Sequence, residues 1–523
     1  MDVINNLVFG FEHALTLQNL LLCATGCVVG MLVGLLPGLG PLATISLLLP
    51  LTFSLPPAGA LIMLAGIYYG AQYGDNVSAI TMKIPHAASI VACIDGYQMT
   101  LKGKTGVALF TAGVSSFIGG TVAILVLAWL APALSNVALL FGPVEYCALV
   151  LFGFVCVSFV TTGSVLDGLA MCFVGVLLGQ VGTDIETGGQ RFTFNIISLS
   201  DGIHLVSIAL GLFGIAEITK NLDNKEQRSP FSGAIKLIPT WPEFKRIFPS
   251  ALRGSVVGSV LGIMPGGGPV IAQFAAYAVD KKLSKYRDEI GQGAIEGVAG
   301  QAAADEAAAR TSFIPLMSLG IPENAVMALM MAAFIINGIQ PGPSMIAKHP
   351  ELFWGLVASM WIGNCFLLLL NVPLVRVWLS VFKIKYSSLF PAILFFCCIG
   401  TYSINSNIHD IYTTAVFGVL GYVFLRFKLD PAPLILGFIL GPMLEENFRR
   451  AMLINRGSFE PFVTRPISAF LIGLVTLFFA WQLISFFLDI RKQRAARIAA
   501  SGVSAAPAVS AASAPEGQLK PEV

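Results

Sequence analysis

Two long stretches without charged residues are the feature that most constrains this chain. Residues 13–74 contain no Asp, Glu, Lys or Arg, and residues 105–144 contain none either. A helix needs about 20 apolar residues to cross the hydrocarbon core of a bilayer. Each stretch is therefore long enough for more than one crossing, or for one crossing and a re-entrant segment. The two stretches predict an integral membrane protein that crosses the bilayer several times.

The composition of the whole chain leads to the same fold class. Only 11% of the 523 residues are charged, and 56% are hydrophobic. A soluble domain carries about 25% charged residues, which it needs to cover its surface. We therefore expect an all-α polytopic membrane protein with about 12 transmembrane helices and additional broken or re-entrant helices. The net charge of +2 gives no indication of binding to nucleic acid.

An internal repeat predicts that the chain consists of two related halves. After a shift of 228 positions, nine of the sixteen residues in 26–41 match their counterparts in 254–269. Most of the matches are glycine or proline, and these rarely recur at fixed spacing by chance. We therefore expect a first membrane repeat at 1–250 and a second at 251–490. The tail at 491–523 starts basic and continues as an Ala/Ser/Pro mixture, which predicts disorder.

The distribution of basic residues predicts that the two halves have inverted topology. Short cytoplasmic loops are enriched in Lys and Arg. The loop near 53–58 has no basic residue, whereas residues 280–293 in the second half contain four. Further along the bias reverses, with two basic residues in 95–105 and one in 339–350. We also expect the polar and basic central loop at 219–250 and the C-terminal tail to lie in the cytoplasm.

Each half contains a glycine-rich helix followed by a Pro-Gly-x-Gly-Pro segment. Glycines four residues apart form a flat strip on which another helix can pack closely. The following prolines and glycines cannot continue the helix, so they predict a helix broken within the membrane. A kinked packing helix is the structural alternative. The substrate- or ion-binding residues predicted in these segments are Pro37, Gly38, Gly40, Pro41 and Thr44 in the first half, and Pro265, Gly266, Gly268 and Pro269 in the second.

The broken helices also suggest where a coupling ion could bind. Secondary transporters place half-helix ends and freed backbone carbonyls at substrate and Na⁺ sites. Backbone groups near Gly38, Gly40, Gly266 and Gly268 are therefore candidate Na⁺ ligands. The five histidines form no metal-binding motif, and no cofactor is expected.

A second pair of breaks follows further along each half, at Ile84-Pro85 and Ile321-Pro322. We expect residues 76–92 to form a broken segment. Small polar residues lie near both breaks, and the predicted site includes Asn76, Ser78, Pro85, Pro322 and Asn324. For each polar residue, an ordinary hydrogen bond to a neighbouring helix is an equally good explanation.

Arg310 lies in an Ala-rich helix and has two interpretations. Placing a charged side chain within a membrane costs free energy, so we treat a charged residue there as a candidate functional residue. Glu306 precedes Arg310 by four residues, so an ion pair within the helix is one interpretation. The other is that the planar guanidinium of Arg310 binds a substrate carboxylate.

These motifs together resemble the large membrane subunit of the tripartite tricarboxylate transporters. The resemblance covers about 20–480 and rests on both Gly/Pro motifs, the Tyr-Tyr-Gly-Ala-x-Tyr-Gly run at 68–74, Asp95-Gly96-Tyr97, both Ile-Pro breaks and Gln340-Pro341-Gly342-Pro343. It implies a secondary transporter in the inner membrane of a Gram-negative bacterium. The implied partners are a small four-helix membrane subunit and a periplasmic solute-binding protein that delivers a carboxylate.

The sequence thus predicts a symporter that imports an organic di- or tricarboxylate with Na⁺ or H⁺. A gradient-independent anion channel and a non-transporting membrane scaffold are the alternatives. A membrane-embedded enzyme would need His, Asp or Glu residues converging on one leaflet, and the charges here show no such clustering. We therefore expect no enzymatic activity.

Overall fold

The computed structural model describes most of the chain outside its tail. The described residues are 3–36, 40–83, 89–138, 140–160, 164–184, 187–216, 219, 239–264, 268–374, 377–378, 391, 394–395, 397–399, 401–402, 407–480 and 482. The predicted tail at 491–523 lies outside these ranges. Five predicted site residues also lie outside them, namely Pro37, Gly38, Pro85, Pro265 and Gly266.

The described part of the first half is almost entirely helical. Its helices are α1 (Val3–Ala14), α2 (Leu17–Leu35), α3 (Pro41–Leu48), η1 (Leu49–Ser54), α4 (Pro57–Met82), α5 (Ala92–Leu101), α6 (Thr105–Ala138), α7 (Pro143–Val160), α8 (Val165–Gly179), η3 (Ile197–Leu199), α9 (Leu205–Ala209) and η4 (Leu210–Ile215). Two short strands, β1 (Gly182–Thr183) and β2 (Gln190–Arg191), pair antiparallel.

The described part of the second half is helical as well. Its helices are α11 (Trp241–Ile263), α12 (Gly268–Leu283), α13 (Ile295–Thr311), α14 (Phe313–Leu319), α15 (Ala325–Ile336), α16 (Pro343–Lys348), α17 (Pro350–Asn371), α20 (Ile408–Arg426), α21 (Ala432–Ile454) and α22 (Glu460–Thr464). The all-α expectation is therefore confirmed for the residues that the structure describes.

Four of the described helices are long and apolar enough to cross a membrane. They are Leu17–Leu35, Thr105–Ser135, Pro350–Asn371 and Ile408–Arg426. Six shorter apolar helices accompany them: Pro41–Thr52, Pro143–Val155, Val165–Gly179, Leu205–Ile215, Ala325–Ile336 and Pro466–Ala480. These helices agree with a multi-pass membrane protein, and the total of about 12 spans stays a prediction.

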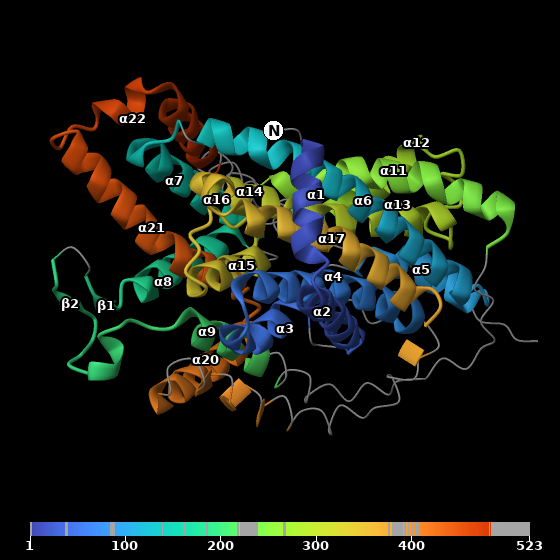
Figure 1. The fold of residues 1–523 in the computed structure, drawn as a ribbon, viewed down its shortest axis with the longest axis horizontal. Helices are drawn as coiled ribbons and strands as arrows, with labels where there is room; N and C mark the ends of the chain where they lie inside the picture. Colours follow the sequence, from blue (N-terminus) through green and yellow to red (C-terminus); the bar gives the residue numbers. More distant parts are fainter. Residues whose placement is uncertain are drawn as a thin grey trace, which may run out of the picture.

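Two buried helices, α4 and α13, form the centre of the molecule. Every residue of α13 is buried, and so is every residue of α4 between Gly59 and Thr81. Helix α13 packs against α4, α5, α6, α11 and α12. Figure 1 shows α11, α12 and α13 at one end of the molecule, and α7, α8, α21 and α22 at the other.

The glycine-rich helices α2 and α11 pack closely on these two central helices. A methyl group added to Gly26, Gly30 or Gly34 of α2 would lie 2.1–2.3 Å from a backbone carbonyl oxygen of α4. A methyl group added to Gly254, Gly258 or Gly262 of α11 would lie 2.1–2.4 Å from a backbone carbonyl oxygen of α13. The repeated glycines therefore have the same function in both places, which is to allow two backbones to approach closely.

Two helices extend further than the sequence analysis expected. Helix α4 continues to Met82, through residues predicted to be part of a broken segment, and ends at Lys83 in the left-handed conformation (φ +56°). The side chains of Ser78 and Thr81 donate to carbonyls of their own helix, at Asp75 and Val77, so both buried hydroxyls have partners without a break in the helix.

Helix α11 begins within the predicted polar central loop. It starts at Trp241 because Thr240 and Glu243 form a capping box, in which each side chain satisfies a backbone N–H of the other residue. The predicted loop is shorter at this end as a result.

Candidate functional site

The first predicted break separates α2 from α3. Helix α2 ends at Leu35, and α3 begins at Pro41 with Gly40 as its N-cap residue. Proline suits the first turn of a helix because the N–H that it lacks has no partner there. The Thr44 hydroxyl donates to the Gly40 carbonyl at 2.9 Å. The backbone N–H of Thr44 donates to the same carbonyl at 3.1 Å, so Thr44 belongs to the first turn of α3.

The second predicted break separates α11 from α12, and here the structure brings two predicted segments together. The backbone N–H of Gly268 donates to Oε1 of Glu323 at 2.5 Å. Glu323 follows Pro322 in the linker between α14 and α15, and it is 2% exposed. The next residue, Asn324, is the N-cap of α15 and accepts from the backbone N–H of Met327. The Ile-Pro segment of the second half therefore lies directly at the start of α12.

A buried cluster of amides surrounds Asp305 where α4, α12 and α13 meet. We call its members, Gln72, Asn76, Gln273, Gln301 and Asp305, the amide cluster. Asp305 accepts hydrogen bonds from the side-chain nitrogens of Gln72 (3.3 Å), Asn76 (3.3 Å) and Gln273 (3.1 Å). Gln301 donates to Oδ1 of Asn76 at 3.3 Å. All five side chains are at most 1% exposed.

Arg310 lies one helical turn beyond this cluster and forms an ion pair with Glu306. Both side chains are fully buried. The guanidinium also donates to Oδ1 of Asn364 at 3.0 Å and lies 4.3 Å from the centroid of the Tyr69 ring. The ion pair is the one that the spacing of four residues predicts. Binding of a substrate carboxylate by Arg310 stays a prediction.

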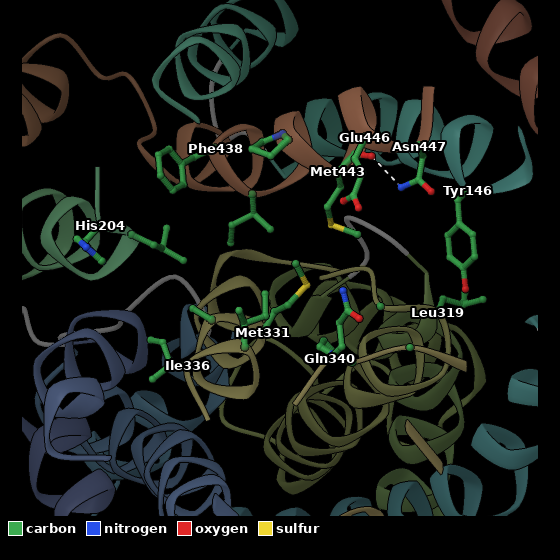
Figure 2. Close-up of a pocket in the computed structure, with 18 of the residues that line it drawn as sticks. Tyr146, His204, Leu319, Met331, Ile336, Gln340, Phe438, Met443, Glu446 and Asn447 are labelled. Atoms are coloured by element: carbon green, nitrogen blue, oxygen red, sulfur yellow. Dashed lines mark hydrogen bonds between the residues drawn. The ribbon is translucent and has the colours of Figure 1, made fainter. Parts of the chain in front are cut away.

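A cavity of about 630 Å³ opens beside the second Ile-Pro break. Leu319 and Gly320, which precede Ile321-Pro322, form part of its wall, as do Gln340, Pro341 and Gly342. Figure 2 shows Gln340 facing Met443 and Glu446 of α21 across the cavity. The polar lining residues are Tyr146, His204, Gln340, Glu446, Asn447 and Arg450. The volume is typical of a small-molecule site.

The predicted site residues are thus distributed over several places. Asn76 belongs to the amide cluster, whereas Gly268, Pro322 and Asn324 gather at the start of α12. Gly40 and Pro41 begin α3, and Pro269 lies in the first turn of α12. Sequence analysis missed Gln72, Gln273, Gln301, Glu323 and the cavity residues. Their positions depend on contacts between distant segments; in the sequence, Asn76 and the charges at Glu306 and Arg310 indicated part of this region.

A comparison with protein families decides what kind of protein has this arrangement. The model of the tripartite tricarboxylate transporter TctA family matches residues 20–436. The chain belongs to this family. TctA proteins are membrane subunits of tripartite transporters, so membership indicates a transport protein that works with partner subunits.

Two relatives from Agrobacterium vitis are similar to the chain over much of their own length. An uncharacterized 52.8 kDa protein in the TAR-I ttuC' 3' region is 51% identical over 498 residues, which cover 94% of this chain and 98% of the relative. An uncharacterized protein in the TAR-II ttuC' 3' region is 58% identical over 217 residues, which cover 42% of this chain and 90% of the relative. No solved structure matches this TctA family member.

Proposed function

We propose that this chain is the large membrane subunit of a secondary transporter that imports an organic di- or tricarboxylate with Na⁺ or H⁺. The observation that carries the proposal is the match to the TctA family over residues 20–436. The proposed partners are a small four-helix membrane subunit and a periplasmic binding protein that delivers the substrate. The proposed location is the inner membrane of a bacterium, with the central loop and the tail in the cytoplasm.

The two halves, in this proposal, are inverted-topology repeats, and the glycine contacts support their relationship. Gly30 of α2 packs on the Ile67 carbonyl of α4, and Gly258 of α11 packs on the Ala304 carbonyl of α13. Gly30 and Gly258 are equivalent in the sequence repeat. Helices α4 and α14 also both end in a left-handed residue, Lys83 and Gly320, directly before an Ile-Pro pair. Alternating access would then arise from movement of one half against the other.

The cavity beside α21 is the proposed substrate site. Gln340 and Asn447 carry amide donors, and Arg450 carries a cationic donor suited to a carboxylate. Arg450 already pairs with Glu446 at 2.5 Å, so a bound carboxylate would compete with Glu446 for the guanidinium. Both side chains are partly exposed, which leaves them free to rearrange.

A transport assay with purified components tests the proposal. The chain and its small partner would be reconstituted into proteoliposomes, and uptake of labelled di- and tricarboxylates measured with and without the binding protein. We expect uptake of at least one carboxylate, and we expect it to depend on the binding protein. Uptake that is independent of the binding protein and of any ion gradient would indicate a channel. No uptake by a folded, complete complex would indicate a scaffold.

A further inference from the structure

Asp305 is a fully buried carboxylate whose visible partners are all neutral. Its hydrogen bonds come from Gln72, Asn76 and Gln273, at 3.1–3.3 Å. No salt-bridge partner of Asp305 occurs among the residues that the structure describes. A charge in this position is costly unless an opposite charge compensates it.

The neighbouring charges do not supply that compensation. Arg310 is the buried cation on the same helix, but it forms its ion pair with Glu306. Glu306 and Asp75 are the acidic neighbours of Asp305, so neither can neutralise its carboxylate. Among the described residues, Asp305 therefore has no cationic partner, and a bound cation would supply the missing charge.

Unused oxygen atoms in the same cluster give a second, independent indication of a ligand. Within the described part of the chain, Oε1 of Gln72 and Oε1 of Gln301 accept no hydrogen bond, although both side chains are buried. The nitrogen atoms of the same two amides bond to Asp305 and to Asn76. Both unpartnered oxygens therefore belong to groups that already contact the cluster. Buried polar atoms normally have a partner, and each of these two oxygens lacks one among the described residues.

We propose that the amide cluster binds a sodium ion, with Asp305 as its carboxylate ligand. Carboxylate and amide oxygens are the ligands that hard cations prefer. The amide hydrogen bonds to Asp305 are longer than the usual 2.9–3.0 Å, and a half-turn of an amide presents its oxygen in place of its nitrogen. A proton would need one acceptor only and would leave the amide oxygens without a function. The described residues contain no group of three or more His, Cys, Asp or Glu suited to a metal ion, which argues against a divalent ion.

A sodium ion at this place would connect the two halves of the chain. Gln72 and Asn76 come from α4 in the first half, whereas Gln273 comes from α12 and Asp305 from α13 in the second. Occupancy would therefore hold α4 against α12 and α13. The role of this ion in coupling rests on the proposed function, but the binding itself does not.

The test measures binding of ²²Na⁺ to the purified full-length chain in detergent. We expect saturable binding that excess unlabelled Na⁺ displaces, and we expect Asp305→Asn to weaken it at least tenfold. Asparagine keeps the size of the side chain and its ability to accept from the amides, so the variant should fold. Asp288→Asn is the matched control, because Asp288 is 96% exposed on its side chain and lies outside the cluster. The control should bind Na⁺ as the wild type does.

A second variant covers the case in which Asp305→Asn does not fold. Gln301→Leu removes an amide oxygen, keeps Asp305, and should weaken ²²Na⁺ binding at least threefold. A folded wild-type chain without saturable ²²Na⁺ binding would overturn the site, and so would wild-type affinity in both variants. Transport is measured separately, so a chain that binds Na⁺ but transports no carboxylate would contradict the proposed function and leave the sodium site standing.

Discussion

The two central helices α4 and α13 have the same packing but different chemistry. Each is buried along almost its whole length, and each carries a glycine-rich helix packed on its backbone carbonyls. Both helices contribute buried amides and a buried aspartate, Asp75 on α4 and Asp305 on α13; helix α13 adds the ion pair between Glu306 and Arg310. The packing of the two halves is thus alike, while the chemistry of the buried site differs between them. A duplicated fold can keep its helix contacts and still carry a different set of buried charges in each half.

The largest expected effect comes from breaking the ion pair on α13. Glu306→Gln leaves the buried guanidinium of Arg310 without its partner, which should cost about 3–5 kcal/mol of unfolding free energy. Thermal or denaturant unfolding in detergent measures the loss. Asn371→Asp, which alters a buried amide on α17, tests whether any change of charge in the core is equally damaging. Stability of the Glu306→Gln variant equal to that of the wild type would contradict the ion pair.

Close packing on α4 and α13 should be equally sensitive to bulk in both halves. Leucine at Gly30 or at Gly258 would overlap a backbone carbonyl that lies 2.3 Å from the added methyl position. Each variant should lose about 3 kcal/mol or more of stability, because backbone cannot give way as a side chain can. Gly473→Ala is the control, since no atom lies within 4 Å of its added methyl group. A large loss at only one of the two glycines would show that the halves do not share this packing.

The cavity borders the break of the second half, and Arg450 is its cationic residue. Arg450→Gln removes a charge-assisted hydrogen bond worth about 1.5–3 kcal/mol, so the KM for the carboxylate should rise roughly tenfold or more. The kcat should change much less. Arg456→Gln provides a control, because Arg456 does not line this cavity. An unchanged KM in Arg450→Gln would remove this cavity from substrate binding.

The two breaks should respond differently to the smallest substitution. Gly268 has a left-handed φ of +39°, whereas Gly40 has an ordinary φ of −73°. Because alanine disfavours the left-handed conformation, Gly268→Ala should lower the free energy of unfolding by about 1–2 kcal/mol. Gly40→Ala should lower it by less. Unfolding midpoints of the two variants measured side by side give the difference. A greater loss at Gly40 would contradict the conformation described at Gly268.

Local sequence patterns predicted a good part of this structure. Glycine spacing predicted the close packing of α2 and α11, because that contact needs only the absence of a side chain every fourth residue. The interval of four residues predicted the Glu306–Arg310 pair for the same kind of reason. Both features depend on neighbours along one helix.

The composition of the site could not be predicted in the same way. Gln72 and Asp305 come together only because α4 and α13 pack side by side, and no interval along the chain shows this. The contact between Gly268 and Glu323 likewise depends on how two linkers meet. Helix α4 continues through residues predicted to be broken, and its Ser78 and Thr81 hydroxyls bond to carbonyls of the same helix, which residue types alone do not show.

The most direct test of sodium-coupled import is whether a Na⁺ gradient drives accumulation of the substrate. Proteoliposomes with the chain, its small partner and the binding protein would receive an inward Na⁺ gradient, with labelled carboxylate outside. We expect accumulation above the external concentration, followed by a fall to equilibrium when a sodium ionophore collapses the gradient. Uptake that stops at equilibrium, and is unchanged by ionophores for sodium and for protons, would contradict it.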